Sequence, residues 1–440
     1  MKSQFLRTLT LCIFVAIFGN HWFQPAQAAS IKTLPSSDTV STFVTIFPQL
    51  KTMSAPPAIR AGLRFTYDFV TSGSGGSAAG ISQNDVAALD ATTALIVQQG
   101  YGDNGLGSLV PTSSSSYFEL PSVSHSWIHP QILVNAESAK TDVLDVTRTE
   151  DSDGAGKIYK VVRFTLTSGN DPQTDVITDW EFDEQSGVLI FYKLQSAAMQ
   201  AQIRLRSLRQ ITLPWPAGCR PNWVQTGAKL NYTGGLRLVQ PAVGTDGTLP
   251  IASNNSVIQA TGRWAAWQTD YYFNSSLQSS GFTGHGTGQL AGSYWLPATA
   301  LAFNPAAPLL DQDPVTGVET LWQRDANNNI VITARTSTWY SNSYYDSANG
   351  AMIAVEVQLP VAYGYQITTL QLTNLPSSLS AVHRASTCAG DPPAPTPSPS
   401  TPSPTPVPVA SPSPHPSPTA TRIPVSGAGS SHTYLPLVTR

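Results

Sequence analysis

Alternating apolar and polar positions recur along most of the chain. Phe65, Tyr67 and Phe69 alternate with polar residues, and residues 162–167 repeat this pattern around Phe164. In an extended chain, such alternation places apolar side chains on one face and polar side chains on the other. Helical periodicity is poor nearly everywhere. The pattern therefore predicts half-buried β-strands.

Turn-forming residues separate the predicted strands. Residues 151–154 read Asp-Ser-Asp-Gly, and residues 325–329 read Asp-Ala-Asn-Asn-Asn. Asx side chains and glycine allow the positive φ that tight hairpins need. The stretch from Asp85 to Gln99 fits either a helix or a twisted pair of strands, and we favour the strands.

Four patterns in the first part of the chain return in the same order about 162 to 176 residues later. Internal repeats of this kind indicate duplicated structural units. The alternative is one large β domain with recurring turn chemistry. The matched segments are Gly62–Tyr67 with Gly227–Tyr232, Leu120-Pro121 with Leu296-Pro297, Phe182–Ile190 with Tyr345–Ile353, and Gln202-Ile203 with Gln366-Ile367.

We therefore predict an all-β fold with two tandem, duplicated antiparallel β-sheet domains, followed by a disordered proline-rich tail. The predicted domains span 58–218 and 223–385, after an N-terminal extension at 29–57. A Pro/Ser/Thr-rich linker at 390–431 and a short C-terminal tag at 432–440 follow them. Proline at about every second or third position removes backbone donors and favours an extended spacer.

The N-terminus has the layout of a secretory signal. Lys2 and Arg7 precede an apolar run of about ten residues, and Ala26-Gln27-Ala28 offers a cleavage site. A membrane-spanning helix needs about 20 apolar residues. We therefore predict a signal peptide at 1–28 and a secreted or cell-surface protein, with an uncleaved anchor as the alternative.

Charge excludes nucleic acid as a partner. The chain has 24 basic and 27 acidic residues. Cleavage after residue 28 removes Lys2 and Arg7, so 22 basic residues remain and the net charge moves from −3 to −5. A nucleic-acid-binding domain needs a concentrated basic patch, which this sequence lacks.

Two cysteines remain once Cys12 leaves with the signal peptide. Cys219 and Cys388 follow equivalent ends of the two predicted copies. In an oxidising compartment an even pair can form a stable disulfide. We predict that they pair, with two separate buried thiols as the alternative.

Two histidines are the first candidates for metal or catalytic chemistry. His125 and His129 are four residues apart, but Pro121 and Pro130 flank them and disfavour a helix of useful length. On a strand their rings would lie about 13 Å apart, too far for one ion. We predict no metal site and no cofactor.

Three acids alternate with aromatic residues at Asp179, Glu181 and Asp183. Glycoside hydrolysis uses paired carboxylates. However, the second copy keeps only Asp346, at the position of Asp183. We interpret the three acids as a solvated strand face and predict no catalytic residue among them.

Glycine runs and aromatic clusters complete the candidate sites. The runs at 73–76 and 284–288 lack the lysine and the strand–turn–helix setting of a phosphate-binding loop. The second copy is rich in aromatic rings, which can stack on sugars or hold apolar ligands. Core packing is the alternative role for them. The weak binding candidates are Trp264, Trp267, Tyr271 and Tyr272.

The tail carries a family resemblance. The Pro-Ser/Thr string at 391–423 and the terminal residues Tyr434-Leu435-Pro436-Leu437-Val438-Thr439-Arg440 resemble the linker and Tyr-Leu-Pro-Leu-Val-x-Arg end of many secreted proteins of filamentous bacteria. This resemblance implies recognition by export or sorting machinery. In the body, only Asp-x-x-Ser-Gly-x-Leu at 183–189 is similar to a known element, a hairpin of lipoprotein-carrier-like half-barrels that is also common in other β proteins.

These observations favour a non-catalytic secreted or cell-surface β protein that acts as a binding or structural module. A polysaccharide or an apolar compound would be a suitable ligand. Two alternatives remain. One is a secreted hydrolase of polysaccharide or peptide, which would need Glu181 to converge with His125 or His129. The other is an apolar-ligand carrier, which would need a deep cavity between a sheet and its cover.

Overall fold

The computed structural model describes residues 37–74, 76–103, 109–168, 175–215, 218–240, 245–361 and 363–374. The predicted signal peptide, linker and C-terminal tag lie outside the described residues. Within the described ranges, no helix has the length and apolar character needed to cross a membrane.

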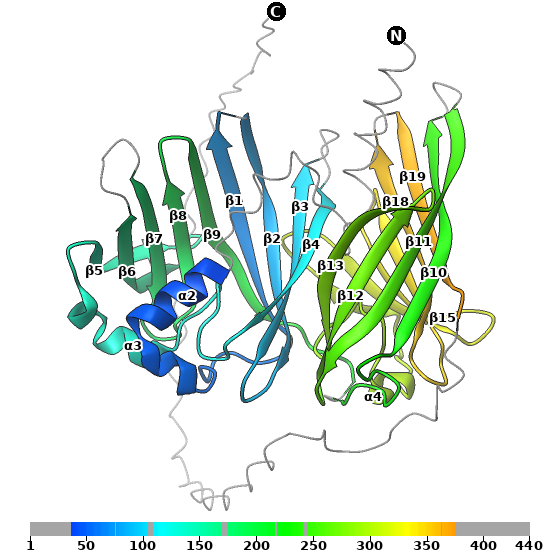
Figure 1. Cartoon of the computed structure of the whole chain (residues 1–440), viewed down its shortest axis with the longest axis horizontal. Helices are drawn as coiled ribbons and strands as arrows, with labels where there is room; N and C mark the ends of the chain where they lie inside the picture. The colour runs from blue at the N-terminus through cyan, green and yellow to red at the C-terminus, as the bar shows by residue number, and fades with distance from the viewer. Residues whose placement is uncertain are drawn as a thin grey trace, which may run out of the picture. The chain divides into compact units, whose positions relative to one another are not determined.

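Strands dominate the structure and form two large antiparallel sheets (Figure 1). This confirms the predicted all-β fold. Sheet 1 lies in half one, which we define as residues 37–215, and sheet 2 lies in half two, residues 218–374. Both sheets belong to one compact unit. They fall within the predicted ranges 58–218 and 223–385, whose boundaries stay predictions.

Sheet 1 has nine strands in the order β4-β3-β2-β1-β9-β8-β7-β6-β5. Strands that follow one another in the chain pair as hairpins, except β4 and β5, which form the two opposite edges of the sheet. Strand β9 returns to pair with β1. The predicted strand pair between Asp85 and Gln99 is confirmed as parts of β2 and β3. The strands are β1 Leu63–Gly73, β2 Gly76–Leu89, β3 Ala94–Asp103, β4 Leu109–Glu119, β5 Leu144–Ser152, β6 Ile158–Ser168, β7 Val176–Asp183, β8 Leu189–Gln195 and β9 Met199–Gln210.

Sheet 2 has ten strands in the order β13-β12-β11-β10-β19-β18-β17-β16-β15-β14. Apart from the added edge strand β14, this is the strand order of sheet 1. The strands are β10 Lys229–Gln240, β11 Thr245–Ala260, β12 Trp264–Phe273, β13 Ser276–Gly286, β14 Leu309–Gln312, β15 Glu319–Arg324, β16 Ile330–Arg335, β17 Tyr340–Tyr345, β18 Met352–Val361 and β19 Gly364–Leu372.

Matched glycines begin the two sheets. Gly62 and Gly227 precede β1 and β10 with φ of +82° and +88°. Each amide donates to the carbonyl of a matched valine, Val86 or Val257, at 2.8 Å. Because residues with a side chain rarely adopt such φ values, glycine is favoured at both points. The shared geometry supports the correspondence that the sequence pattern indicated.

The connection between β4 and β5 corrects one part of the sequence alignment. Leu120-Pro121 was matched with Leu296-Pro297, but Trp127 and Trp295 make the equivalent bridges, to Val188 and Ala351. The pairs Ile128–Gly187 and Leu296–Gly350 then share the same backbone hydrogen bond at 2.8 Å. The counterpart of Leu296 is therefore Ile128, eight residues after Leu120. Proline-containing dipeptides are common in loops, so this match arose from composition.

Short helices accompany the sheets. Helix α2, Ser37–Ile46, is rich in β-branched residues, which have low helix propensity, so packing must hold it. Phe43 supplies that packing: it is fully buried, and its ring lies edge-on to Phe164, Trp180 and Phe182. Helix α2 thus covers the face of sheet 1 that carries these aromatic rings (Figure 1). We call the face of each sheet that carries the core of its own half the inner face, and the opposite face the outer face. The other helical segments are η2 Pro48–Thr52, α3 Pro130–Val134, η3 Ala136–Ala139 and α4 Ala298–Leu301.

Candidate functional site

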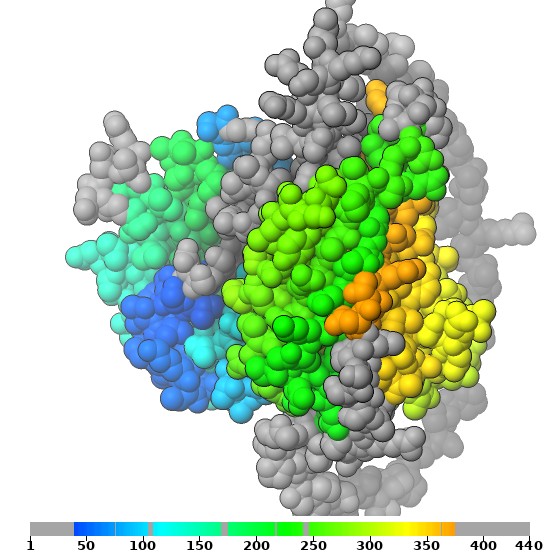
Figure 2. Space-filling model, turned by 45° about the vertical axis from the view of Figure 1, so that its right-hand side comes forward, coloured from blue at the N-terminus to red at the C-terminus, as the bar shows by residue number. Residues whose placement is uncertain are grey.

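The outer face of sheet 1 packs against half two through two apolar clusters. In one, the small side chains of Ala87 and Ala88 lie against Trp264, whose Nε1 donates to Asp90 Oδ2 at 2.9 Å. In the other, Tyr101 packs with Trp339, with ring centroids 6.5 Å apart. Figure 2 shows blue and cyan atoms of half one beside green atoms of half two.

An ionic network joins the halves beside these clusters. Arg64 of β1 donates to Asp85 at 2.6 and 2.7 Å and to Asp313 at 3.1 Å. Arg209 of β9 donates to both oxygens of Asp311 at 2.7 Å and to Asp313 at 2.9 Å. Two arginines of half one thereby hold two aspartates of half two.

Asp313 is the centre of this network, with only 1% of its side chain exposed. Burial by itself raises the pKa of this carboxyl group. Arg64, the backbone amide of Thr316 and Arg209 lower it more strongly, and the resulting pKa is about 2. Asp313 therefore stays charged between the halves over the physiological pH range.

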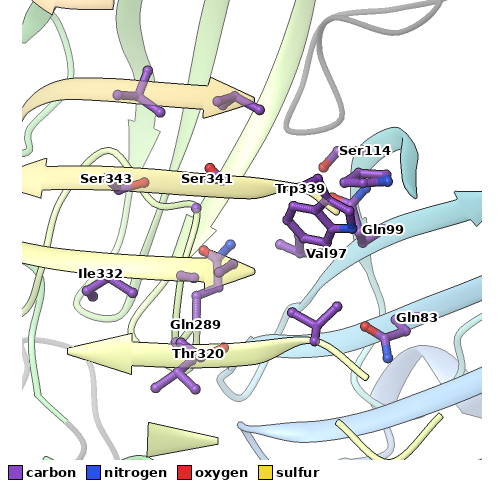
Figure 3. Close-up of a pocket in the computed structure, with 18 of the residues that line it drawn as sticks. Gln83, Val97, Gln99, Ser114, Gln289, Thr320, Ile332, Trp339, Ser341 and Ser343 are labelled. Carbon is purple, nitrogen blue, oxygen red and sulfur yellow. The ribbon is translucent and has the colours of Figure 1, made fainter. Parts of the chain in front are cut away.

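A cavity of about 160 Å³ lies between the outer face of sheet 1 and the inner face of sheet 2. Figure 3 shows Gln83, Val97 and Gln99 on strands of sheet 1, opposite Ile332 and Ser343 on strands of sheet 2. Most of the lining is apolar. Its apolar members include Val97, Tyr101, Val318, Ile332, Trp339 and Leu370.

The two halves differ at the place where this cavity lies. Counting back three residues from the matched hairpin aspartates Asp183 and Asp346 makes Trp180 the counterpart of Ser343. Phe164 pairs with Trp180, and Ile332 pairs with Ser343, so these two also correspond. Half one therefore has large aromatic rings where half two has smaller side chains.

The cover differs as well. In half one, helix α2 lies over Phe164 and Trp180 through Phe43. The described residues before β10, at 211–215 and 218–228, contain turns but no helix. In half two, the outer face of sheet 1 covers the inner face of sheet 2, and the cavity lies between these two faces.

The four aromatic binding candidates lie outside the cavity lining. Trp267 and Tyr271 are buried in the core of half two. Trp264 packs between the halves, with its ring centroid 4.9 Å from that of Phe118. Tyr272 is partly exposed on β12. A ligand role for these four rings stays a prediction, whereas the cavity draws on different residues.

The two histidines serve separate local structures. His125 Nδ1 lies 3.0 Å from Glu119 Oε1, and its ring contacts Tyr117 edge-on. His129 Nδ1 accepts from the Gln131 amide at 3.3 Å and so caps α3. Within the described ranges no group of three or more His, Cys, Asp or Glu side chains could hold a metal ion.

The three acids of β7 have separate partners. Thr165 donates to Asp179 at 2.6 Å, Arg163 donates to Glu181 at 2.7 Å, and the Ser186 amide donates to Asp183 at 2.9 Å. The last bond caps the turn after β7. The interpretation of the three acids as a solvated strand face is wrong at Glu181, which is fully buried because it lies against its cross-strand neighbour Arg163.

Glu181 does not converge with the histidines. Its neighbours Trp180 and Phe182 point into the core, so Glu181 faces the opposite side of sheet 1. His125 borders a small void together with the core residues Leu189 and Ile203. Burial, followed by a hydrogen bond with Asp151, raises the pKa of Glu181 to about 7. The convergence that the hydrolase alternative needs is absent from this part of the described structure.

The cysteine and glycine predictions have different outcomes. Cys219 is in a disulfide, and Cys388 lies outside the described residues, so their pairing stays a prediction. The glycine run at 284–288 permits close packing: a Cβ at Gly284 would collide with Leu95 and Phe118, and one at Gly288 would crowd backbone atoms of Val86 and Ala87.

Sequence reasoning missed the cavity residues. Arg64, Gln83 and Gln99 occupy polar positions of strands, and alternation alone gives no reason to expect that the polar face of a strand is buried. The available signals were the small residues Ala87 and Ala88 and the glycine run at 284–288, which the structure brings together. Such positions permit close packing of two backbones.

Comparisons with known proteins identify no family. No family model matches the chain, and no curated protein matches it. Among solved structures, MucB in complex with MucA(peri) has a TM-score of 0.22 and 10% identity, covering 76% of this chain and 92% of that chain. MucB alone has a TM-score of 0.21 and 11% identity, covering 76% and 93%.

A third structure is a protein of unknown function from the DUF3598 family of Nostoc punctiforme PCC 73102. It has a TM-score of 0.17 and 10% identity, and it covers 70% of this chain and 95% of that chain. Likenesses at these scores establish neither a fold family nor a function for this protein.

Proposed function

We propose that this protein is an exported, non-catalytic β protein whose folded body binds a small, mostly apolar ligand in the cavity between its sheets. The observation that carries the proposal is the cavity itself, in the place that aromatic side chains and α2 fill in half one. This matches the apolar-carrier alternative more closely than a purely structural role.

The size of the cavity defines the ligand. A cavity of about 150 Å³ lined by Leu, Ile and Phe binds benzene and stays dry. The cavity here has about the same volume and an apolar lining that includes Trp339. A single aromatic ring or a short branched chain therefore fits this volume.

The test uses cumene as a probe with the full-length secreted protein. Isothermal titration calorimetry should show one site per chain, and the thermal midpoint should rise with probe concentration, because a ligand that binds only the folded state stabilises it. Absence of binding up to the solubility limit of cumene would refute the proposed function.

Half one supplies the design of a blocking variant. Ile332→Phe places in half two the side chain that half one has at Phe164, and it should fill the cavity. We expect cumene binding to fall at least about ten-fold, with the thermal midpoint unchanged or higher, because filling a cavity is commonly stabilising. Ile158→Phe is the matched control, since Ile158 is 69% exposed on β6. Unchanged binding in Ile332→Phe would place the probe elsewhere.

We propose export from the sequence of the two ends. The signal at 1–28 would direct secretion, and the linker at 390–431 would hold the tag at 432–440 away from the body for export or sorting machinery. Deleting residues 425–440 should shift the protein between cell-surface and medium fractions. An unchanged distribution would remove the sorting role while leaving the ligand proposal intact.

A further inference from the structure

Two buried polar atoms face the cavity. Gln83 and Thr368 line it, and each side chain is only 2% exposed. Within the described structure, Gln83 Nε2 and Thr368 Oγ1 have no hydrogen-bond partner. Buried polar groups in proteins are nearly always paired. A ligand in the cavity can therefore gain a hydrogen bond from each wall, one on β2 and one on β19.

The charged and amide groups beside Gln83 on this wall are already engaged. Gln99, directly opposite Gln83 in the pairing of β2 with β3, donates to Ser113 O at 2.6 Å and Gly100 O at 3.1 Å. Arg64 is held by Asp85 and Asp313. Gln83 therefore offers an uncommitted donor beside groups that have partners.

The charges around the cavity disfavour an anionic ligand. The ionic network at its edge contains two arginines and three aspartates, so it has an excess of one negative charge: Arg64 and Arg209 against Asp85, Asp311 and Asp313. Both arginines form ion pairs within it. A carboxylate ligand would lose its hydration and meet this net negative field without an available cation.

We propose, on the basis of the proposed function, that the ligand is uncharged and carries one hydrogen-bond acceptor, such as a carbonyl or hydroxyl oxygen, that Gln83 binds. An amide nitrogen only donates, so its partner must be an acceptor. The Thr368 hydroxyl can donate or accept, so it is a second polar contact that tolerates either group. Gln83 is then the residue that determines specificity.

Three probes with the same number of heavy atoms separate the contributions of apolar contact, hydrogen bonding and charge to binding. They are cumene, acetophenone and benzoate. Cumene is apolar, acetophenone adds a carbonyl oxygen, and benzoate adds a negative charge. By calorimetry with the full-length protein, acetophenone should bind at least about ten-fold more tightly than cumene, because a site with an unpaired polar group discriminates against a ligand that cannot pair it. Benzoate should bind more weakly than acetophenone.

Gln83→Leu removes the donor while keeping a similar side-chain volume. This variant should lose about ten-fold in acetophenone affinity and bind cumene at least as well as the parent protein. Gln278→Leu is the matched control, because Gln278 is exposed on β13. Cumene binding by Gln83→Leu also reports that the variant is folded.

The outcomes distinguish the two proposals. If cumene does not bind the parent protein, the proposed function fails. If cumene and acetophenone bind equally well to the parent protein, the cavity binds apolar ligands but Gln83 does not select them. Equal acetophenone affinity in Gln83→Leu and the parent would also overturn the inference, since a water molecule would then satisfy the amide.

Discussion

The two halves use the same strand order and cover their inner faces differently. In half one, Phe43 of α2 fills the space over Phe164 and Trp180. In half two, the corresponding residues are Ile332 and Ser343, and both line a cavity. One sheet is therefore packed like an ordinary protein core, while its counterpart keeps a space of about 160 Å³.

This difference shows which residues build the sheets and which residues form the cavity. Matched glycines and hairpins build both sheets, so the scaffold alone does not create the cavity. Smaller side chains on β16 and β17 and a different cover create it. The cover of half two is the outer face of sheet 1, so residues of half one such as Gln83 and Tyr101 become part of the site.

The largest expected effect comes from removing the cover of half one. Phe43→Ala deletes a fully buried ring that contacts three aromatic side chains. Such a change costs about 3–5 kcal/mol in unfolding free energy. Chemical denaturation measures it. Phe282→Ala is the control, because Phe282 is 68% exposed and its loss should stay within about 0.5 kcal/mol. A loss below about 1 kcal/mol in Phe43→Ala would show that α2 is not the essential cover.

Local sequence patterns predicted the parts of the fold that depend on local physics. Alternation predicted strands, and the turn residues at 151–154 and 325–329 predicted the connections between β5 and β6 and between β15 and β16. The backbone geometry of a turn and the side of a strand on which a side chain lies depend only on neighbouring residues. These features therefore appear in both halves and can be read without a structure.

The cavity could not be predicted in this way because it depends on contacts between distant residues. Arg64 and Asp313 are separated by 249 positions, and no pattern near either residue indicates the other. Helix α2 was also missed within the predicted extension at 29–57, since its β-branched residues do not favour a helix. Tertiary packing through Phe43 forms it.

The second largest expected effect is that acid weakens the connection between the halves. The pKa of Asp313 is about 2, below the ordinary value of 3.8. A carboxyl group with a lowered folded-state pKa stabilises the protein above its unfolded-state pKa, and this contribution is lost as pH falls from about 4 to 2. We expect a loss of about 2 kcal/mol over that range. Denaturation at several pH values measures it.

Asp313→Asn sharpens this prediction. The variant should be less stable than the parent at neutral pH and should lose the part of the acid dependence that Asp313 contributes. Asp270→Asn is a control in half two, because Asp270 accepts bonds from Gln268 and Ser280 away from the arginines. If Asp313→Asn keeps the full acid dependence, other carboxyl groups cause it.

Alanine substitution of the two matched hairpin glycines should lower stability by different amounts. Gly187 and Gly350 have φ of +74° and +75°, so alanine is strained at both positions. A Cβ at Gly350 would lie 2.6 Å from Leu296 O, and one at Gly187 would come closer still to Ile128 O. Each Gly→Ala change should cost more than about 1 kcal/mol, and Gly187→Ala should cost more. Gly247→Ala is the control, since nothing lies near its Cβ position. If the Gly187→Ala, Gly350→Ala and Gly247→Ala variants were equally stable, the two hairpins would not share a requirement for glycine.

The smallest effect concerns a matched pair of arginines. Arg148 Nη2 donates to Leu133 O at 2.8 Å and Val134 O at 3.0 Å at the end of α3, and Arg324 Nη2 donates to Leu301 O at 3.1 Å at the end of α4. Cationic side chains stabilise helix C-terminal carbonyls. Each Arg→Ala change should therefore cost about 1 kcal/mol, somewhat more at Arg148 because it has two carbonyl partners.

The double variant tests whether these matched contacts act independently. Arg148 and Arg324 share no bonded partner, since Arg148 also contacts Glu137 and Glu184 whereas Arg324 contacts Asn328. Losses at independent sites add within about 0.5 kcal/mol. A double variant whose loss in denaturation experiments departs further from the sum would show that the halves couple through more than the contacts at the cavity. Additivity would show that the two helix-end contacts act independently, each stabilising its own half.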